Sequence, residues 1–167
     1  IYTDQLLNNF SLRQSFIRET MGRNDFRFYP LSHQDLHILS WFTPYTKVWS
    51  LVSALELITT IILGCCLVQL TNRNKASSSL FLMGSLLFLF TSATAFNYFQ
   101  FIYSERILTF FLALYIYHYS IYQASGHKKN GLFALLFALY IPFLKDTAIL
   151  LAVIPAASTM LLGSLGK

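Results

Sequence analysis

The chain has 167 residues and a net charge of +5, with 55% hydrophobic and only 11% charged residues. An average soluble domain carries about 25% charged residues, so this chain has less than half the usual polar covering. Such values exclude a disordered chain, a collagen, a soluble nucleic-acid-binding module and an ordinary cytosolic enzyme. The composition therefore predicts an integral membrane protein.

Residues 1–47 are the polar part of the chain, and they carry signals for two short helices. The first is expected over about residues 12–21, with Gly22 placed to end it. The second begins at the capping pattern Ser32-His-Gln-Asp35 and ends before Pro44. Because apolar residues and a tryptophan follow that pattern, this helix is expected to lie along the membrane surface.

Apolar segments dominate the rest of the chain, and a spanning helix needs about 20 such residues. The predicted spans are about 48–70, 79–96, 105–123, 131–144 and 147–165. The last two share one apolar run that is interrupted at Lys145 and Asp146. The segment 131–144 is short, so we expect it to be tilted or half-inserted. The sequence thus predicts an all-α, polytopic bundle of transmembrane helices with a helical first loop.

The distribution of charge predicts the orientation of these spans. If residues 1–47 lie outside the cell, the alternating loops on the inside contain only cations and no acid. These inside cations are Arg73, Lys75, Lys128, Lys129 and Lys167. The remaining charges cancel, so the whole net charge lies on the predicted cytoplasmic side. The basic character therefore indicates membrane orientation rather than nucleic-acid binding.

The two ends of the sequence predict that it is part of a longer protein. It opens at Ile1, and a polar stretch that reaches the outside needs a preceding span to carry it there. It stops at Lys167, directly after the last predicted span. We therefore expect a further span before the first residue and additional chain after the last.

Two short stretches resemble a known family. Arg27-Phe-Tyr-Pro-Leu-Ser-His-Gln-Asp35 is similar to the Gly-Arg-Phe-Phe-Pro-Leu-x-x-Gln-acid stretch of bacterial GT-C membrane glycosyltransferases. Leu144-Lys-Asp-Thr147 resembles the Lys-acid step at a later extracytoplasmic turn of those proteins. The family often has two acids in or near its first-loop motif, whereas Asp4 stands alone here. The resemblance covers most of the chain and implies a multi-pass protein of the bacterial inner membrane.

The resemblance also implies a reaction and a set of residues. A sugar would move from a polyprenyl-phosphate carrier to an acceptor glycan or lipid of the cell envelope, on the outer side. Asp4 would be the catalytic base that deprotonates the acceptor hydroxyl. Residues expected to bind substrate are Arg27, His33, Gln34, Asp35, Glu105, Arg106, Lys145 and Asp146. We expect the stretch 23–35 to pack over the outer ends of the spans near the last four of these.

Several of these residues also have purely structural explanations. Asp4 is also explained as an exposed acid at a chain end or as the cap of a helix. Asp35 is also explained as part of a capping box. The neighbouring charges at 105–106 and at 145–146 could each neutralise themselves at the interface. Cations are nevertheless the natural ligands of a lipid phosphate, and Lys145 stands out because it interrupts a long apolar run.

Polar groups inside the predicted spans need partners. An ionised, unpaired Glu56 would cost several kcal/mol there, and Arg106, Lys145 or His118 lie at matching depth. A face of one span carries Tyr115, His118, Tyr119 and Tyr122 at helical spacing. A hydrogen-bonded seam between helices is the expected role of this face, and a cavity lining is the alternative.

Other motifs of enzyme chemistry are absent from the sequence. There is no glycine-rich phosphate loop, no nucleophile elbow and no His/Cys metal cluster. Cofactor requirements stay open, a divalent cation included. Cys65 and Cys66 are adjacent in an apolar run and indicate nothing about redox compartment. The alternative to a transferase is a non-catalytic membrane subunit or a transporter, with Glu56, His118 and the tyrosines along a polar path.

Overall fold

A computed structural model describes residues 31, 34–71, 78–99, 105–145 and 147–165 of the chain. Its regular elements are α3 (Gln34–Phe42), α4 (Thr46–Thr71), α5 (Ser78–Leu89), α6 (Ser92–Phe99), α7 (Glu105–Ser125), α8 (Lys128–Tyr140), the 3₁₀ turn η1 (Ile141–Phe143) and α9 (Ala148–Leu165). The all-α fold expected from the sequence is confirmed for these residues. The expected helix at about 12–21 lies outside them.

The capacity to cross a membrane is clearest for α4. Within the described ranges, α4 is the one unbroken helix that is long and apolar enough to span a bilayer, and α5 with α6 makes a second candidate if the bent pair counts as one span. The helix bounds of α7, α8 and α9 lie close to the other predicted segments. Insertion of those three helices stays a prediction.

The segment predicted as one span at 79–96 is two helices in the structure. α5 and α6 meet at an angle of 67°. At the break, the Thr91 hydroxyl donates to the carbonyl of Phe88 (2.9 Å) and accepts from the backbone N–H of Thr94 (3.3 Å). Hydroxyl side chains of this kind compete with the helical ladder and cap a new helix, which explains the break.

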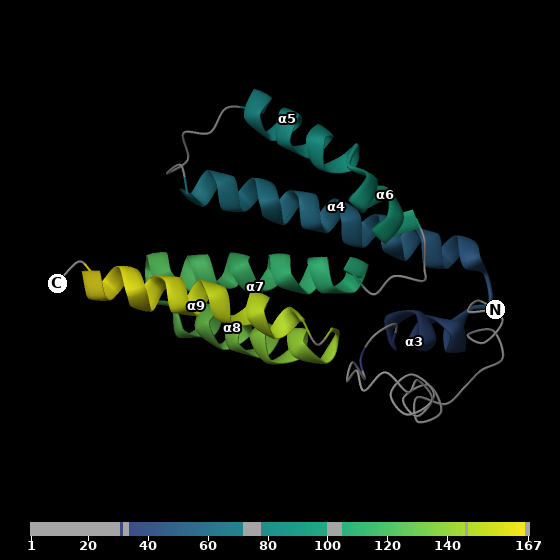
Figure 1. Ribbon diagram of the computed structural model, residues 1–167. Coiled ribbons are helices and arrows are strands. Elements are labelled where there is room, and N and C mark those ends of the chain that lie inside the picture. The colour runs from purple at the N-terminus through teal and green to yellow at the C-terminus, as the bar shows by residue number, and fades with distance from the viewer. Residues whose placement is uncertain (1–30, 32–33, 72–77, 100–104, 146, 166–167) are drawn as a thin grey trace.

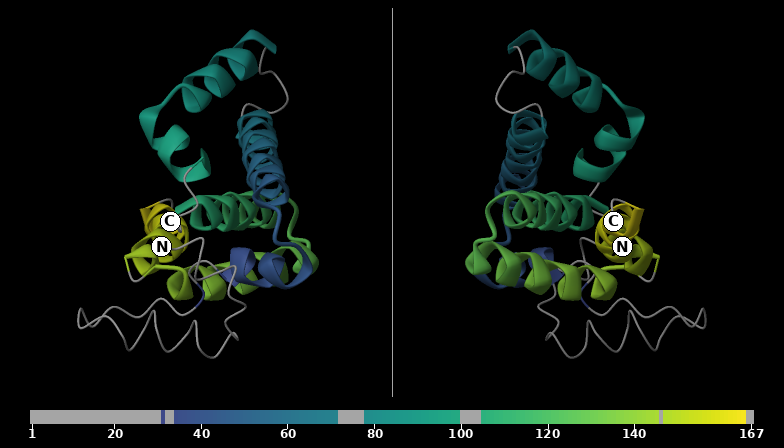
Figure 2. Two further views of the ribbon diagram at one scale, coloured as in Figure 1. Left: turned by 90° about the vertical axis from the view of Figure 1, so that its right-hand side faces the viewer. Right: turned by 90° about the vertical axis from the view of Figure 1, so that its left-hand side faces the viewer.

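The core lies between α7, α8 and the start of α9. Its buried residues are Ile107, Leu108, Tyr115, Ala134, Ile141, Leu144 and Ala148. Gly126 joins α7 to α8 with φ of +70°, and its N–H donates to the carbonyl of Tyr122 (2.8 Å). This left-handed glycine ends α7 and lets α8 return along it as an antiparallel partner. α5, by contrast, has no buried residue among those described, and it stands off from the other helices (Figure 2).

The order of the helices brings distant segments together at one end of the molecule. α3, the first turns of α4 and α7, and the turn between α8 and α9 all lie at the same end (Figure 1). The α7–α8 turn lies at the other end. Segments predicted to be extracytoplasmic therefore share one end of the described structure.

Labelling of single cysteines is expected to separate these two ends. In a background without the native cysteines, cysteines at positions 24 and 103 should react with an impermeant maleimide applied from outside. Cysteines at positions 74 and 130 should react only after the membrane is permeabilised, because cations concentrate in cytoplasmic loops. Labelling of position 74 from outside would contradict the predicted orientation.

Candidate functional site

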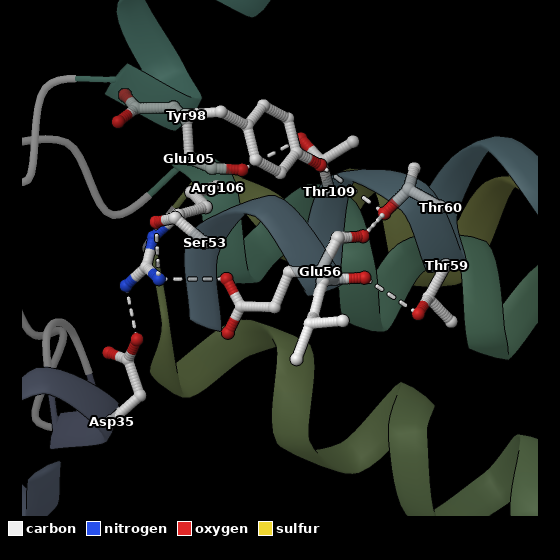
Figure 3. A network of polar contacts seen from close by, with 10 residues as sticks. Asp35, Ser53, Glu56, Thr59, Thr60, Tyr98, Glu105, Arg106 and Thr109 are labelled. Atoms are coloured by element: carbon white, nitrogen blue, oxygen red, sulfur yellow. Dashed lines mark hydrogen bonds and ion pairs between the residues drawn. The ribbon is translucent and has the colours of Figure 1, made fainter. Parts of the chain in front are cut away.

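Arg106 is the centre of a polar cluster that joins three helices (Figure 3). It lies in the first turn of α7, and its side chain is only 2% exposed. Its Nη1 donates to Oε2 of Glu56 (2.8 Å) and to Oγ of Ser53 (3.0 Å), both on α4. Its Nη2 forms an ion pair with Oδ2 of Asp35 on α3. A single guanidinium therefore ties α3 and α4 to α7, and we call Asp35, Glu56 and Arg106 the triad.

The triad is mostly shielded from solvent and incompletely paired. The side chains of Asp35 and Glu56 are 15% and 14% exposed. Oδ1 of Asp35 and Nε of Arg106 are buried and have no hydrogen-bond partner in the described part of the chain. Of the three partners proposed for Glu56 by depth, Arg106 is the one that the structure confirms. A buried guanidinium between two carboxylates is well placed to hold helices in register.

A second ion pair lies beside the triad and is more accessible. Nζ of Lys145, in the turn before α9, pairs with Oε1 of Glu105 at the start of α7. These side chains are 35% and 32% exposed. The charges at 105–106 therefore do not neutralise each other, because neighbouring residues on a helix point in different directions. Lys145 is thus within reach of a bound anion, whereas Arg106 is buried.

The end of the first loop contacts the same place. The backbone N–H of Leu31 donates to the carbonyl of Phe143 in η1 (3.0 Å), and Leu31 packs against the core. Asp35 of the same stretch forms its ion pair with Arg106 at the start of α7. The predicted packing of the stretch 23–35 over the ends of the helices is therefore confirmed for Leu31 and Asp35. Among the described residues, the backbone bond of Leu31 to Phe143 and the ion pair of Asp35 with Arg106 hold the end of the loop.

The other predicted site residues divide into two groups. Asp35, Glu105, Arg106 and Lys145 come together as described, and Gln34 is the first residue of α3, with its side chain outside the description. Residues that lie outside the described ranges are Asp4, Arg27, His33 and Asp146. In the described part of the chain, the candidate site is built from the triad and the pair Glu105–Lys145.

Three further polar residues at this end, Ser53, Thr60 and Tyr98, were not predicted from the sequence. The hydroxyls of Thr60 and Tyr98 lie 3.3 Å apart and are both buried. The hydroxyl of Thr60 also donates to the carbonyl of Glu56 (2.8 Å). On α4, Ser53, Glu56 and Thr60 follow one another at spacings of three and four residues, which is the signal that could have revealed this polar stripe.

The tyrosine and histidine face of α7 forms a seam with α8 and α9. Tyr115 donates to the carbonyl of Ala152 (2.9 Å), and the hydroxyl of Tyr119 lies 2.6 Å from that of Thr159. Nδ1 of His118 lies 3.1 Å from Oδ1 of Asn130 on α8. The expected hydrogen-bonded seam is confirmed for these three residues.

The described residues offer no group of three or more His, Cys, Asp or Glu side chains arranged to hold a metal ion. Comparison of the whole chain with protein-family models, with curated proteins and with solved structures finds no match.

Proposed function

We propose that the chain is part of a GT-C-type membrane glycosyltransferase. The enzyme moves a sugar from a polyprenyl-phosphate carrier to an extracytoplasmic acceptor, a glycan or lipid of the cell envelope. The observation that carries this proposal is the gathering of charge at one end of the helices. The triad and the pair Glu105–Lys145 meet where the first loop docks, which is the end that the family resemblance assigns to the reaction.

Lys145 and Arg106 take different roles in the proposal. Lys145 contacts the phosphate of the carrier lipid, because its ammonium group is one-third exposed and can exchange Glu105 for a phosphate oxygen. Arg106 is a positioning residue, because carboxylates occupy both of its terminal nitrogens. Asp4, in the first loop, is the catalytic base that the resemblance implies.

An apolar groove beside the charged end supports a lipid-linked donor. It lies between α4, α5 and α7, has a volume of about 630 Å³, and includes Gly64, Gly84 and Leu112 in its lining. Thr60 and Thr109 also line it, one helical turn beyond Glu56 and Glu105. A carrier with its phosphate at Lys145 could place its prenyl chain along this groove, among the apolar side chains of α4, α5 and α7.

The transporter alternative calls for polar groups that converge near the middle of the membrane. His118, Tyr115 and Tyr119 each hydrogen-bond to a neighbouring helix, which gives them a structural role. Glu56 is engaged with Arg106 at the end where α7 begins. The transferase is therefore the function that we propose.

Sugar transfer by the full-length protein in lipid vesicles tests the proposal. With a labelled polyprenyl-phosphate sugar as donor, Lys145→Gln should raise the KM for the donor by about 10–100-fold, since a hydrogen bond to a charged group contributes about 1.5–3 kcal/mol. The matched control is Lys47→Gln, which removes an exposed lysine at the start of α4 and should leave the KM unchanged. A donor KM that is insensitive to Lys145→Gln would contradict the assigned role, and absence of transfer by the wild type would contradict the function.

A further inference from the structure

The triad carries more negative than positive charge. Its two carboxylates face one guanidinium, so the cluster has a net charge of −1 when both acids are ionised. Burial makes this surplus expensive, because a charge that is taken out of water needs a partner of its own. One carboxylate oxygen, Oδ1 of Asp35, is buried and has no hydrogen-bond partner among the described residues. The cluster thus has both a surplus charge and an unused acceptor.

The groups around the triad do not supply the missing positive charge among the side chains that the structure describes. Lys145, the nearest cation on the α8–α9 turn, pairs with Glu105 of α7. Tyr98 of α6 lies near Glu56, and its hydroxyl contacts that of Thr60. Tyr140 of α8 lies near Asp35. Both are phenols that are neutral over the ordinary pH range. α5 and α9 contain no ionisable side chain.

We propose that the triad is a binding site for one proton, and that this proton controls how firmly α3 is held against α4 and α7. The proton resides on Glu56. Asp35 lies in the first turn of α3, where the helix dipole stabilises a negative charge. Glu56 lies in the interior of the 26-residue α4 and has no such support from its own helix.

The direction of the effect follows from the competition for Arg106. When Glu56 carries the proton, the guanidinium charge is left to Asp35 alone, and the ion pair that holds α3 is at its strongest. When Glu56 loses the proton, its carboxylate shares Arg106 and also repels Asp35. α3 is therefore held more firmly at low pH and is released as the pH rises.

Distances between spin labels on α3 and α8 test the inference in the full-length protein. Cysteines replace the exposed Phe42 and Leu139 in a background without Cys65 and Cys66, and pulsed electron resonance measures the distance distribution in lipid nanodiscs. Between about pH 5 and about pH 9, the wild type should change from one narrow distribution to a mixture with a longer component. A wild-type distribution that is the same at both ends of this range would overturn the proposal without recourse to any variant.

Three variants assign the proton to its residue. Glu56→Gln mimics the protonated acid and should give the narrow distribution at every pH. Asp35→Asn removes the charge that holds α3 and should give the longer component at every pH. His37→Gln removes the imidazole that α3 itself carries and should leave the wild-type pH response in place. A pH response that survives in Glu56→Gln, or that is lost in His37→Gln, would overturn the assignment of the proton to the triad.

Discussion

Replacement of Arg106 with methionine is expected to lower the free energy of unfolding by about 3–5 kcal/mol. Methionine has similar length and suits an apolar setting, so the loss comes mainly from the two carboxylates left behind. Asp35 and Glu56 would stay mostly buried without the cation that pairs with both. Reversible unfolding of the full-length protein in detergent micelles measures the change.

A double-mutant background supplies the control for this prediction. In protein that already carries Asp35→Asn and Glu56→Gln, Arg106→Met should cost much less, because no buried negative charge is left unpaired. An equal loss in the two backgrounds would show that the size of the arginine side chain matters and that its charge does not. The comparison separates packing from electrostatics at a residue that is almost completely buried.

Asp4→Asn is expected to have the largest effect on activity. The amide keeps the shape of the side chain but does not accept the proton of the acceptor hydroxyl, so turnover should fall by about 10²–10⁴-fold. Binding of the polyprenyl-phosphate donor and the amount of protein in the membrane should hardly change. Steady-state transfer in vesicles separates the two effects, since the loss should appear in kcat and leave the donor KM nearly constant.

Asp25→Asn is the matched control, because it changes an acid of the same loop. It should leave turnover close to that of the wild type. Full activity in Asp4→Asn would refute its role as the base. A large loss in Asp25→Asn alone would move that role to Asp25.

The positions of the helices could be predicted from the sequence because long apolar runs have few alternatives to a helix. The bounds of α4 and α7 lie within two residues of the segments predicted at 48–70 and 105–123. The bend between α5 and α6 was not predicted, because Thr91 and Ser92 are two polar residues within a long apolar run and their types alone do not mark a break. Their effect depends on which hydroxyl caps the next helix, and composition does not reveal it.

Several charged residues of the candidate site could be named from the sequence, but the ion pairs that they form with one another could not. Depth along the spans limited the partners of Glu56 to three, but the choice of Arg106 depends on how α4 and α7 are rotated about their axes. The hydrogen bond between Leu31 and Phe143 could not be predicted for a different reason. It joins a backbone N–H to a backbone carbonyl, and nearly every residue carries both groups, so the side-chain types give no signal.

The long sequence separations within the triad have a consequence for biosynthesis. Asp35 and Glu56 precede Arg106 by 71 and 50 residues, so the ribosome completes α4 well before the guanidinium exists. During that interval the newly made α4 has an acid in its apolar length and no cation to neutralise it. We therefore expect α4 to be a poorer span on its own than in the finished fold, and its insertion to be helped once α7 has been made.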